Sequence, residues 1–139
     1  MMKSVSAWKQ ELSSGAHAAR LAALYCCAPE ETPAQAARYE AVLNGLDATF
    51  GPHAEAGLYS APGRTEIGGN HTDHQHGRVL AGSVNIDMIA AAAPNDKNQF
   101  RVQSEGYDLC VIDLNDLEAR KDEENTTAAL LRGECAAFA

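Results

Sequence analysis

The chain has 139 residues, 45% of them hydrophobic, with 11 Lys and Arg against 19 Asp and Glu. This length allows no more than one soluble domain. The net charge of −8 argues against nucleic acid or an anionic membrane as a partner, because both are bound through clustered basic residues.

No segment predicts a membrane span or a secretory leader. The longest apolar run, Met88 to Pro94, is far shorter than the roughly 20 residues that cross a bilayer. Cys26 and Cys27 are adjacent, so they do not easily bridge each other, and the sequence has no Cys-x-x-Cys pair. We therefore expect a cytoplasmic protein with reduced thiols and no cysteine metal site.

Two helices are predicted at the start of the chain. The first covers residues 5–27, is weakened by Gly15 and stops at Pro29. The second begins at Thr32-Pro33-Ala34-Gln35, which combines an N-cap, a first-turn proline and a capping-box Gln, and it ends at Gly51-Pro52. Their core-facing residues should be Trp8, Leu12, Ala16, Ala19, Leu21, Ala23 and Leu24, then Ala36, Tyr39, Val42, Leu43, Leu46 and Phe50.

Strands are predicted after Gly57. Residues 58–61 form a short strand candidate that Pro62-Gly63 should break. Residues 79–93 are apolar or small except for Asn85 and Asp87, which suits a buried strand pair. Residues 99–104 and 109–114 predict two antiparallel strands. A charged stretch, 118–125, leads into a helix over 126–139 with Leu130, Leu131 and Phe138 on its apolar side.

The order of elements predicts an α+β fold, with a mixed β-sheet and packed helices. Residues 1–56 form a helical lead-in, 57–114 carry the strands, and 126–139 start a further helix. That last helix lacks a glycine cap, a basic last turn and a polar tail, so it looks cut rather than finished. We expect the chain to be part of a longer protein.

Polar residues concentrate in residues 63–77, which contain four Gly, three His, two acids and one Arg. Glycine-rich polar loops between buried strands often hold functional sites. Gly63 to Gly68 has the spacing of the start of a phosphate-binding P-loop. However, Gly69 and Asn70 stand where that loop needs Lys and Ser or Thr. A phosphate cradle is therefore excluded.

Two other interpretations of this segment remain. His71, Asp73, His74 and His76 are ligand types suited to a divalent metal, although a strand would divide them between two faces. A polyol is the better match, because Asp, Asn, His and Arg side chains together donate to and accept from several hydroxyl groups.

The same residues resemble a known signature. Ala61-Pro62-Gly63-Arg64, Ile67-Gly68, Asn70-His71-Thr72-Asp73 and Gly77 are similar to the amino-terminal signature of galactokinases, members of the GHMP kinase family. Weaker similarity extends to Phe50-Gly51, to residues 87–91 and to residues 131–133. The resemblance implies the amino-terminal domain of a GHMP kinase, truncated, with a galactose-binding loop at 61–77.

The resemblance also implies roles for individual residues. Arg64 matches the catalytic arginine between the reacting hydroxyl and the γ-phosphate, and His71 and Asp73 match positions that bind the sugar. Asn70 is the third substrate-binding residue, and it stands where the family usually has Glu. Because an amide both donates and accepts whereas a carboxylate only accepts, another hexose or an amino sugar remains an alternative to galactose.

The implied activity is transfer of the γ-phosphoryl group of ATP, with Mg²⁺, to the anomeric hydroxyl of galactose, giving galactose 1-phosphate. The complete enzyme would be a monomer in the cytoplasm. The family's ATP-binding loop and catalytic Asp would lie beyond Ala139. We therefore expect the 139 residues alone to be inactive as a kinase and to hold no metal. The alternatives are a free-standing sugar-binding module without kinase activity and a metal-dependent hydrolase that uses the histidine cluster.

Overall fold

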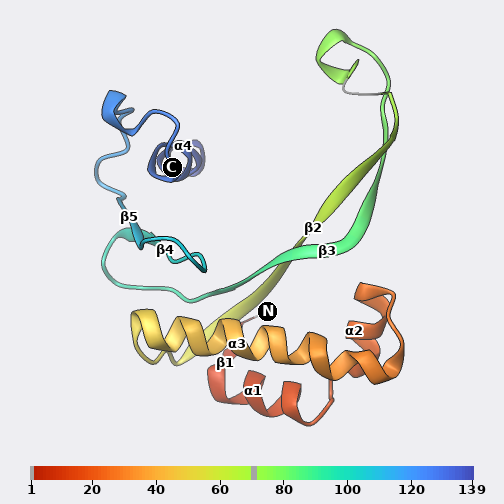
Figure 1. The fold of residues 1–139 in the computed structure, drawn as a ribbon. Helices are drawn as coiled ribbons and strands as arrows, with labels where there is room; N and C mark the ends of the chain where they lie inside the picture. Colours follow the sequence, from red (N-terminus) through yellow and green to blue (C-terminus); the bar gives the residue numbers. More distant parts are fainter. Residues whose placement is uncertain (1, 70–71) are drawn as a thin grey trace. The chain divides into compact units, whose positions relative to one another are not determined.

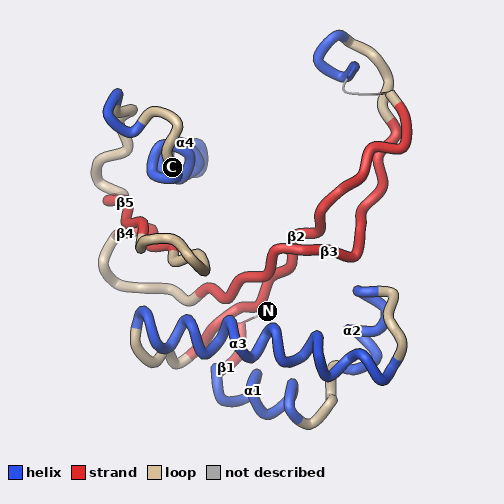
Figure 2. The backbone as a smooth tube through the Cα atoms, in the orientation of Figure 1, coloured by secondary structure: helices blue, strands red, loops and turns tan. Residues whose placement is uncertain are grey.

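A computed structural model describes residues 2–69 and 72–139, with only the backbone of Asp73. The described chain mixes helices and strands, as the α+β prediction requires (Figures 1 and 2). It divides into two compact units, one ending at Ala93 and the other covering Pro94–Ala139. Each unit is described by itself below.

The first unit packs helices against a sheet whose described strands all pair antiparallel, so the mixed sheet that we expected is not found among the described residues. Its strands follow the order β1-β2-β3 in the sheet, and β2 and β3 form a long hairpin. The elements are β1 (Met2–Ser4), α1 (Val5–Ser13), α2 (Ala18–Tyr25), the short 3₁₀ helix η1 (Pro29–Glu31), α3 (Thr32–Phe50), β2 (Glu55–Gly68), the 3₁₀ helix η2 (Thr72–Gln75) and β3 (Leu80–Ala92).

The core of this unit lies between α1, α2, α3 and the start of the hairpin. Leu43 and Ala56 are fully buried, and the indole Nε1 of Trp8 donates to the Ala56 carbonyl at 2.8 Å. This bond joins α1 directly to β2. The buried cluster comprises Val5, Trp8, Leu12, Leu21, Tyr25, Ala36, Tyr39, Leu43, Leu46 and Ala56.

The predicted first helix is two helices. The chain breaks at a turn over residues 14–17, where Gly15 has a φ of 74°. The break resets the helical phase, so that Tyr25 is buried while Ala16, Ala19, Ala23 and Leu24, which we expected in the core, are exposed.

The second helix, α3, begins at Thr32 and ends before Gly51, as predicted. The hydrogen bonds at its start differ from those we expected. The Thr32 hydroxyl donates to the Pro29 carbonyl at 2.8 Å, and the Glu31 carboxylate accepts from the Ala28 amide at 2.8 Å. The expected Thr32–Gln35 capping box is therefore replaced by bonds within η1.

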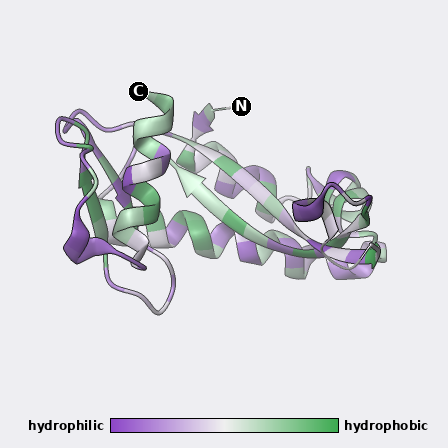
Figure 3. Cartoon of the chain, turned by 90° about the horizontal axis from the view of Figure 1, so that it is seen from above, coloured by the Kyte–Doolittle hydropathy of each residue, from purple (hydrophilic) through white to green (hydrophobic). Residues whose placement is uncertain are grey.

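The hairpin is longer than the sequence suggests. We expected Pro62-Gly63 to end a strand, but β2 continues through both residues to Gly68. Proline is tolerated here because the pairing register shifts between Pro62 and Arg64. Residues 80–92 form the single strand β3 rather than a pair of strands. Apolar residues dominate the end of β3 (Figure 3).

The second unit joins a hairpin to a helix. Strands β4 (Gln99–Val102) and β5 (Cys110–Asp113) pair antiparallel, as predicted, and α4 covers Thr127–Phe138 after the 3₁₀ helix η3 (Lys121–Glu123). Our prediction of the buried face of α4 was wrong for Leu130, which is 64% exposed, and for Phe138, which is 88% exposed, whereas Leu131 is partly buried.

Arg132 is the buried residue of α4. Its Nε and Nη2 donate to both carboxylate oxygens of Glu123, at 2.8 and 2.6 Å, and its Nη1 donates to the Asp116 carbonyl at 2.5 Å. A two-bond guanidinium–carboxylate pair fixes orientation as well as distance. The helix is therefore held to the preceding loop by a polar contact.

All four cysteines are free thiols. No helix in the described ranges 2–69 and 72–139 combines the length and the apolar character that a bilayer crossing requires.

Candidate functional site

The polar segment 63–77 lies at the far end of the β2–β3 hairpin (Figure 1). Its first part, up to Gly68, belongs to β2, and η2 follows. The Thr72 amide donates to the Gly69 carbonyl at 3.0 Å, and the Gly77 amide donates to the Thr72 carbonyl at 2.8 Å. These bonds fold the chain into a compact turn between the strands.

Gly69 closes the neck of this turn. Its φ of 105° lies in the region that favours glycine, and a Cβ there would be 2.5 Å from the Arg78 carbonyl oxygen. A Cβ on Gly77 would collide with the Thr72 side chain. Two of the segment's glycines are thus required by close approach.

Arg64 lies on β2 opposite Ser83 of β3, and it is exposed. It follows a β-bulge directly: Pro62 pairs with Asp87 and Arg64 with Ser83, so residues 84–86 lie opposite Gly63 alone. A Cβ on Gly63 would lie 3.2 Å from Cγ2 of Val84 and 3.3 Å from the Ile86 carbonyl oxygen. The absence of a Cβ at Gly63 therefore allows residues 84–86 of the bulge to pack closely against β2 next to Arg64.

The other predicted site residues are only partly described. Asn70 and His71 lie outside the described residues, and Asp73 is placed only as part of η2. Their contacts with a sugar remain predictions. No cluster of three His, Cys, Asp or Glu side chains among the described residues could hold a metal ion. Because His71 is not among them, the histidine-cluster hypothesis is untested.

Sequence reasoning missed a buried carboxylate beside this segment. The Asp87 side chain is 3% exposed, its Oδ2 accepts from Tyr25 Oη at 2.6 Å and from Ser60 Oγ at 2.5 Å, and its Oδ1 accepts from Arg38 Nη2 at 2.7 Å. The Tyr25 and Tyr39 hydroxyls are 2.8 Å apart. One carboxylate therefore ties β3 to α2, α3 and β2.

These contacts shift the acidities of the cluster. Burial of Asp87 opposes its ionisation, but bonds from Ser60, Tyr25 and Arg38 outweigh burial and hold its pKa below the ordinary value. Burial, followed by the bond to Asp87, raises the pKa of Tyr25. The available signal was the occurrence of an acid within an otherwise apolar strand, since such a charge must be paired.

Asn85, the other polar residue in the strand, also contacts α2. Its Nδ2 donates to the Tyr25 carbonyl at 3.1 Å. Because α2 ends at Tyr25 and Cys26 adopts a left-handed φ of 48°, this carbonyl is near the free end of the helix. The bulge is thus joined to the end of α2.

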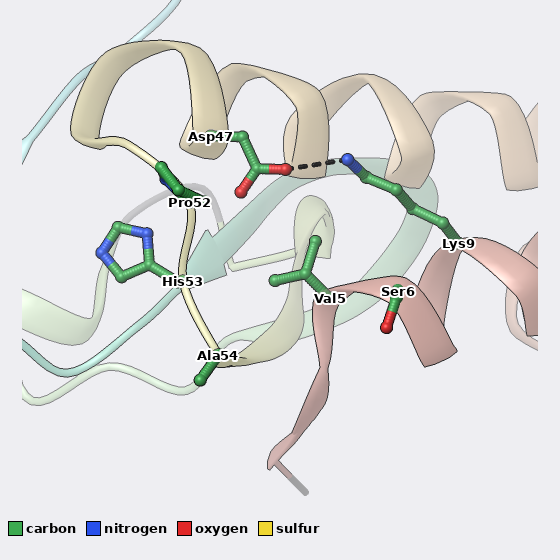
Figure 4. A pocket seen from close by; sticks show the side chains of 7 residues that line it. All are labelled: Val5, Ser6, Lys9, Asp47, Pro52, His53 and Ala54. Carbon is green, nitrogen blue, oxygen red and sulfur yellow. Dashed lines mark hydrogen bonds and ion pairs between the residues drawn. The ribbon is translucent and has the colours of Figure 1, made fainter.

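A separate pocket of about 360 Å³ lies near the start of β2 (Figure 4). It contains the Lys9–Asp47 ion pair, at 2.8 Å, beside His53. Arg64 lies nine residues beyond Glu55 on β2, a path of up to about 30 Å along a strand. This pocket is therefore distinct from the glycine-rich segment.

The glycine-rich segment lies within a region that is similar to known proteins. The family model for the galactokinase galactose-binding signature matches residues 47–94. A galactokinase from Lactobacillus helveticus is 28% identical over 96 residues, 68% of this chain and 24% of the relative. One from Lacticaseibacillus casei (strain BL23) is 35% identical over 74 residues, 52% of this chain and 19% of the relative. One from Streptococcus suis (strain 05ZYH33) is 31% identical over 83 residues, which are 58% of this chain and 21% of the relative.

The chain thus spans about a fifth to a quarter of the length of these relatives. No solved structure matches it. The matched region contains the whole β2–β3 hairpin, including Arg64, residues 70–73 and Asp87. The chain is therefore similar to galactokinases and carries their galactose-binding signature over residues 47–94.

Proposed function

We propose that the segment 63–77 binds galactose, and that it does so as part of a cytoplasmic, monomeric enzyme that phosphorylates galactose. The signature match, which spans Arg64, Asn70, His71 and Asp73, is the observation that supports this proposal. The relatives are named galactokinases, which supports a sugar kinase over the other functions we considered.

The residue types suit a sugar ligand. Asp73 supplies an acceptor for two hydroxyl groups, while Asn70 can donate as well as accept. Arg64 carries a permanent positive charge on an exposed part of β2. In our proposal its guanidinium lies beside the anomeric hydroxyl and stabilises the charge that develops on the transferring phosphoryl group.

ATP would supply the phosphoryl group, and Mg²⁺ would neutralise its phosphates. The described residues offer no cluster of three metal ligands, and the sequence holds no Gly/Ser-rich phosphate loop. Our proposal assigns neither ATP nor Mg²⁺ to a residue of this chain. What the chain itself does, in this proposal, is bind and orient the sugar.

Titration calorimetry of the 139-residue chain tests the proposal. We expect it to bind galactose more tightly than glucose, which differs only at C4, because a site that bonds a hydroxyl discriminates against a misplaced one. Arg64→Ala and Asp73→Ala should each weaken binding, while Arg20→Ala, a change of an exposed arginine on α2, should not. Equal affinity for both sugars, or no binding, would contradict the proposal.

A kinase assay tests the division of labour. We expect no galactose-dependent ATP consumption by this chain alone. Consumption that Arg64→Ala abolishes would show that the residues described here include the ATP site.

A further inference from the structure

The β-bulge opposite Gly63 is the structural link between α2 and Arg64. One residue of β2 lies between Pro62 and Arg64, whereas three residues of β3 lie between Asp87 and Ser83. Bulges bend a strand and increase its twist, so they change the direction in which the next side chains point. The first side chain after this bulge on β2 is that of Arg64.

Arg64 lies on the same face of the hairpin as the Asp87 cluster. Ser60, Pro62 and Arg64 are alternate residues of β2, and alternate residues share a face. Ser60 bonds Asp87, and Pro62 is its cross-strand partner. Asn85 also lies on the side of Asp87, because its Nδ2 bonds the Tyr25 carbonyl at the end of α2. Arg64 is therefore the next residue along the face that the helices cover nearer the start of β2.

Asn85 and Asp87 hold the two ends of the bulge by different means. Asp87 fixes the pairing before the bulge, because a buried carboxylate with three donors from three elements has one favourable position. Asn85 lies within the bulge, and its side chain bonds the Tyr25 carbonyl of α2. Without this bond, the bulge could adopt other backbone geometries while the pairing at Asp87 stayed intact.

We propose that Asn85 is a positioning residue for Arg64: its bond to the end of α2 fixes the bulge opposite Gly63 and thereby fixes the direction in which the Arg64 side chain leaves β2. This inference rests on the proposed function for its consequence, galactose binding, but not for its geometry. Asn85 is exposed as a residue, so its removal should cost little folding stability.

Side-chain NMR tests the geometry without a ligand. The Nε–Hε signal of Arg64, identified by its loss in Arg64→Lys, should shift in Asn85→Ala and in Asn85→Asp, which keeps the size but removes the donor. Asn44→Ala, a change of an exposed asparagine on α3, should leave it in place. The melting temperature should fall by no more than about 4 °C. An unchanged Arg64 signal in both Asn85 variants would overturn the proposal.

A double-mutant cycle tests the consequence. In the wild-type background, Asn85→Ala should weaken galactose binding about threefold to tenfold, since one hydrogen bond contributes about 0.5–1.5 kcal/mol. In the Arg64→Ala background the same change should have almost no effect, because the residue it positions is gone. An equal loss in both backgrounds would show that Asn85 acts by another route.

The two proposals fail in different ways. If the wild-type chain does not bind galactose, the proposed function is wrong, and the Arg64 signal still decides whether Asn85 positions that arginine. If the wild type binds galactose but the Arg64 Nε–Hε signal has the same position in both Asn85 variants as in the wild type, the positioning role is wrong and the proposed function stands.

Discussion

The two halves of the β2–β3 hairpin are built differently. Near the helices, Ala56 is fully buried and Leu58, Ile89 and Ala91 pack against the core. Beyond the bulge, Ile67 is 66% exposed and Leu80 is 62% exposed, and the chain is shaped by glycine contacts and a few hydrogen bonds. Stability and ligand recognition should therefore respond to different substitutions, even though one pair of strands carries both.

The helix-covered half should dominate stability. Leu43→Ala removes a fully buried side chain from α3, and it should lower the free energy of unfolding by about 3–5 kcal/mol, the cost of a core cavity. Urea denaturation followed by circular dichroism measures this. Leu24→Ala, at a side chain 49% exposed on α2, is the matched control. Similar losses in the two variants would refute the contrast between core and surface.

The second largest effect on stability is expected for Asp87, which lies where the helix-covered half of the hairpin ends. Asp87→Ala leaves Tyr25, Arg38 and Ser60 without their shared acceptor, and it should cost about 2–3 kcal/mol. The same denaturation experiment measures it. A loss below about 0.5 kcal/mol would mean that the cluster does not hold the hairpin to the helices.

Part of the Asp87 effect should depend on pH. The folded-state pKa of Asp87 is lowered, so its contribution is fully present above the ordinary carboxyl value, about 3.9, and is lost as the pH falls through the lower folded value. Glu11, Asp116 and Glu123 also have lowered pKa values. Comparison with Asp87→Asn, which cannot titrate, isolates Asp87. We expect the stability difference between wild type and variant to shrink as the pH drops below about 4.

The far half should show its largest effect in binding. Gly69→Ala places a Cβ against the Arg78 carbonyl in a backbone conformation that disfavours it, and it should weaken galactose binding about tenfold, the equivalent of about 1.4 kcal/mol. Gly68→Ala, where nothing lies within 4 Å, is the adjacent control. Calorimetric titration compares the two variants. Equal affinities would show that the neck of the turn does not shape the site.

Much of the fold follows from local pattern, and its departures have physical causes. The proline and glycine signals that bound α3 and the alternation in β4 and β5 are local, and the structure places those elements close to the predicted ranges, although the predicted capping box is not formed. The continuation of β2 through Pro62 is not local, because it depends on a bulge in the partner strand. The burial of Arg132 in place of Leu130 depends on a carboxylate nine residues away, at Glu123.

The candidate site shows the same division. The glycine-rich segment and Arg64 could be identified from their order in the sequence, since the signature is a linear motif. The contacts of Asp87 and Asn85 could not, because Tyr25 lies 62 and 60 residues away from them. Hydrogen bonds between residues so far apart in the sequence produce no periodic pattern of residues from which they could be predicted.

The shared hydroxyl of Tyr25 gives the molecule an intrinsic optical marker. Because burial and the bond to Asp87 raise its pKa, Tyr25 should keep its proton at an alkaline pH at which a tyrosine in water, with a pKa of about 10, loses it. The rise of phenolate absorbance in an alkaline titration should therefore have a late step that belongs to Tyr25. That step reports, without any label, whether the end of α2 is seated on the hairpin.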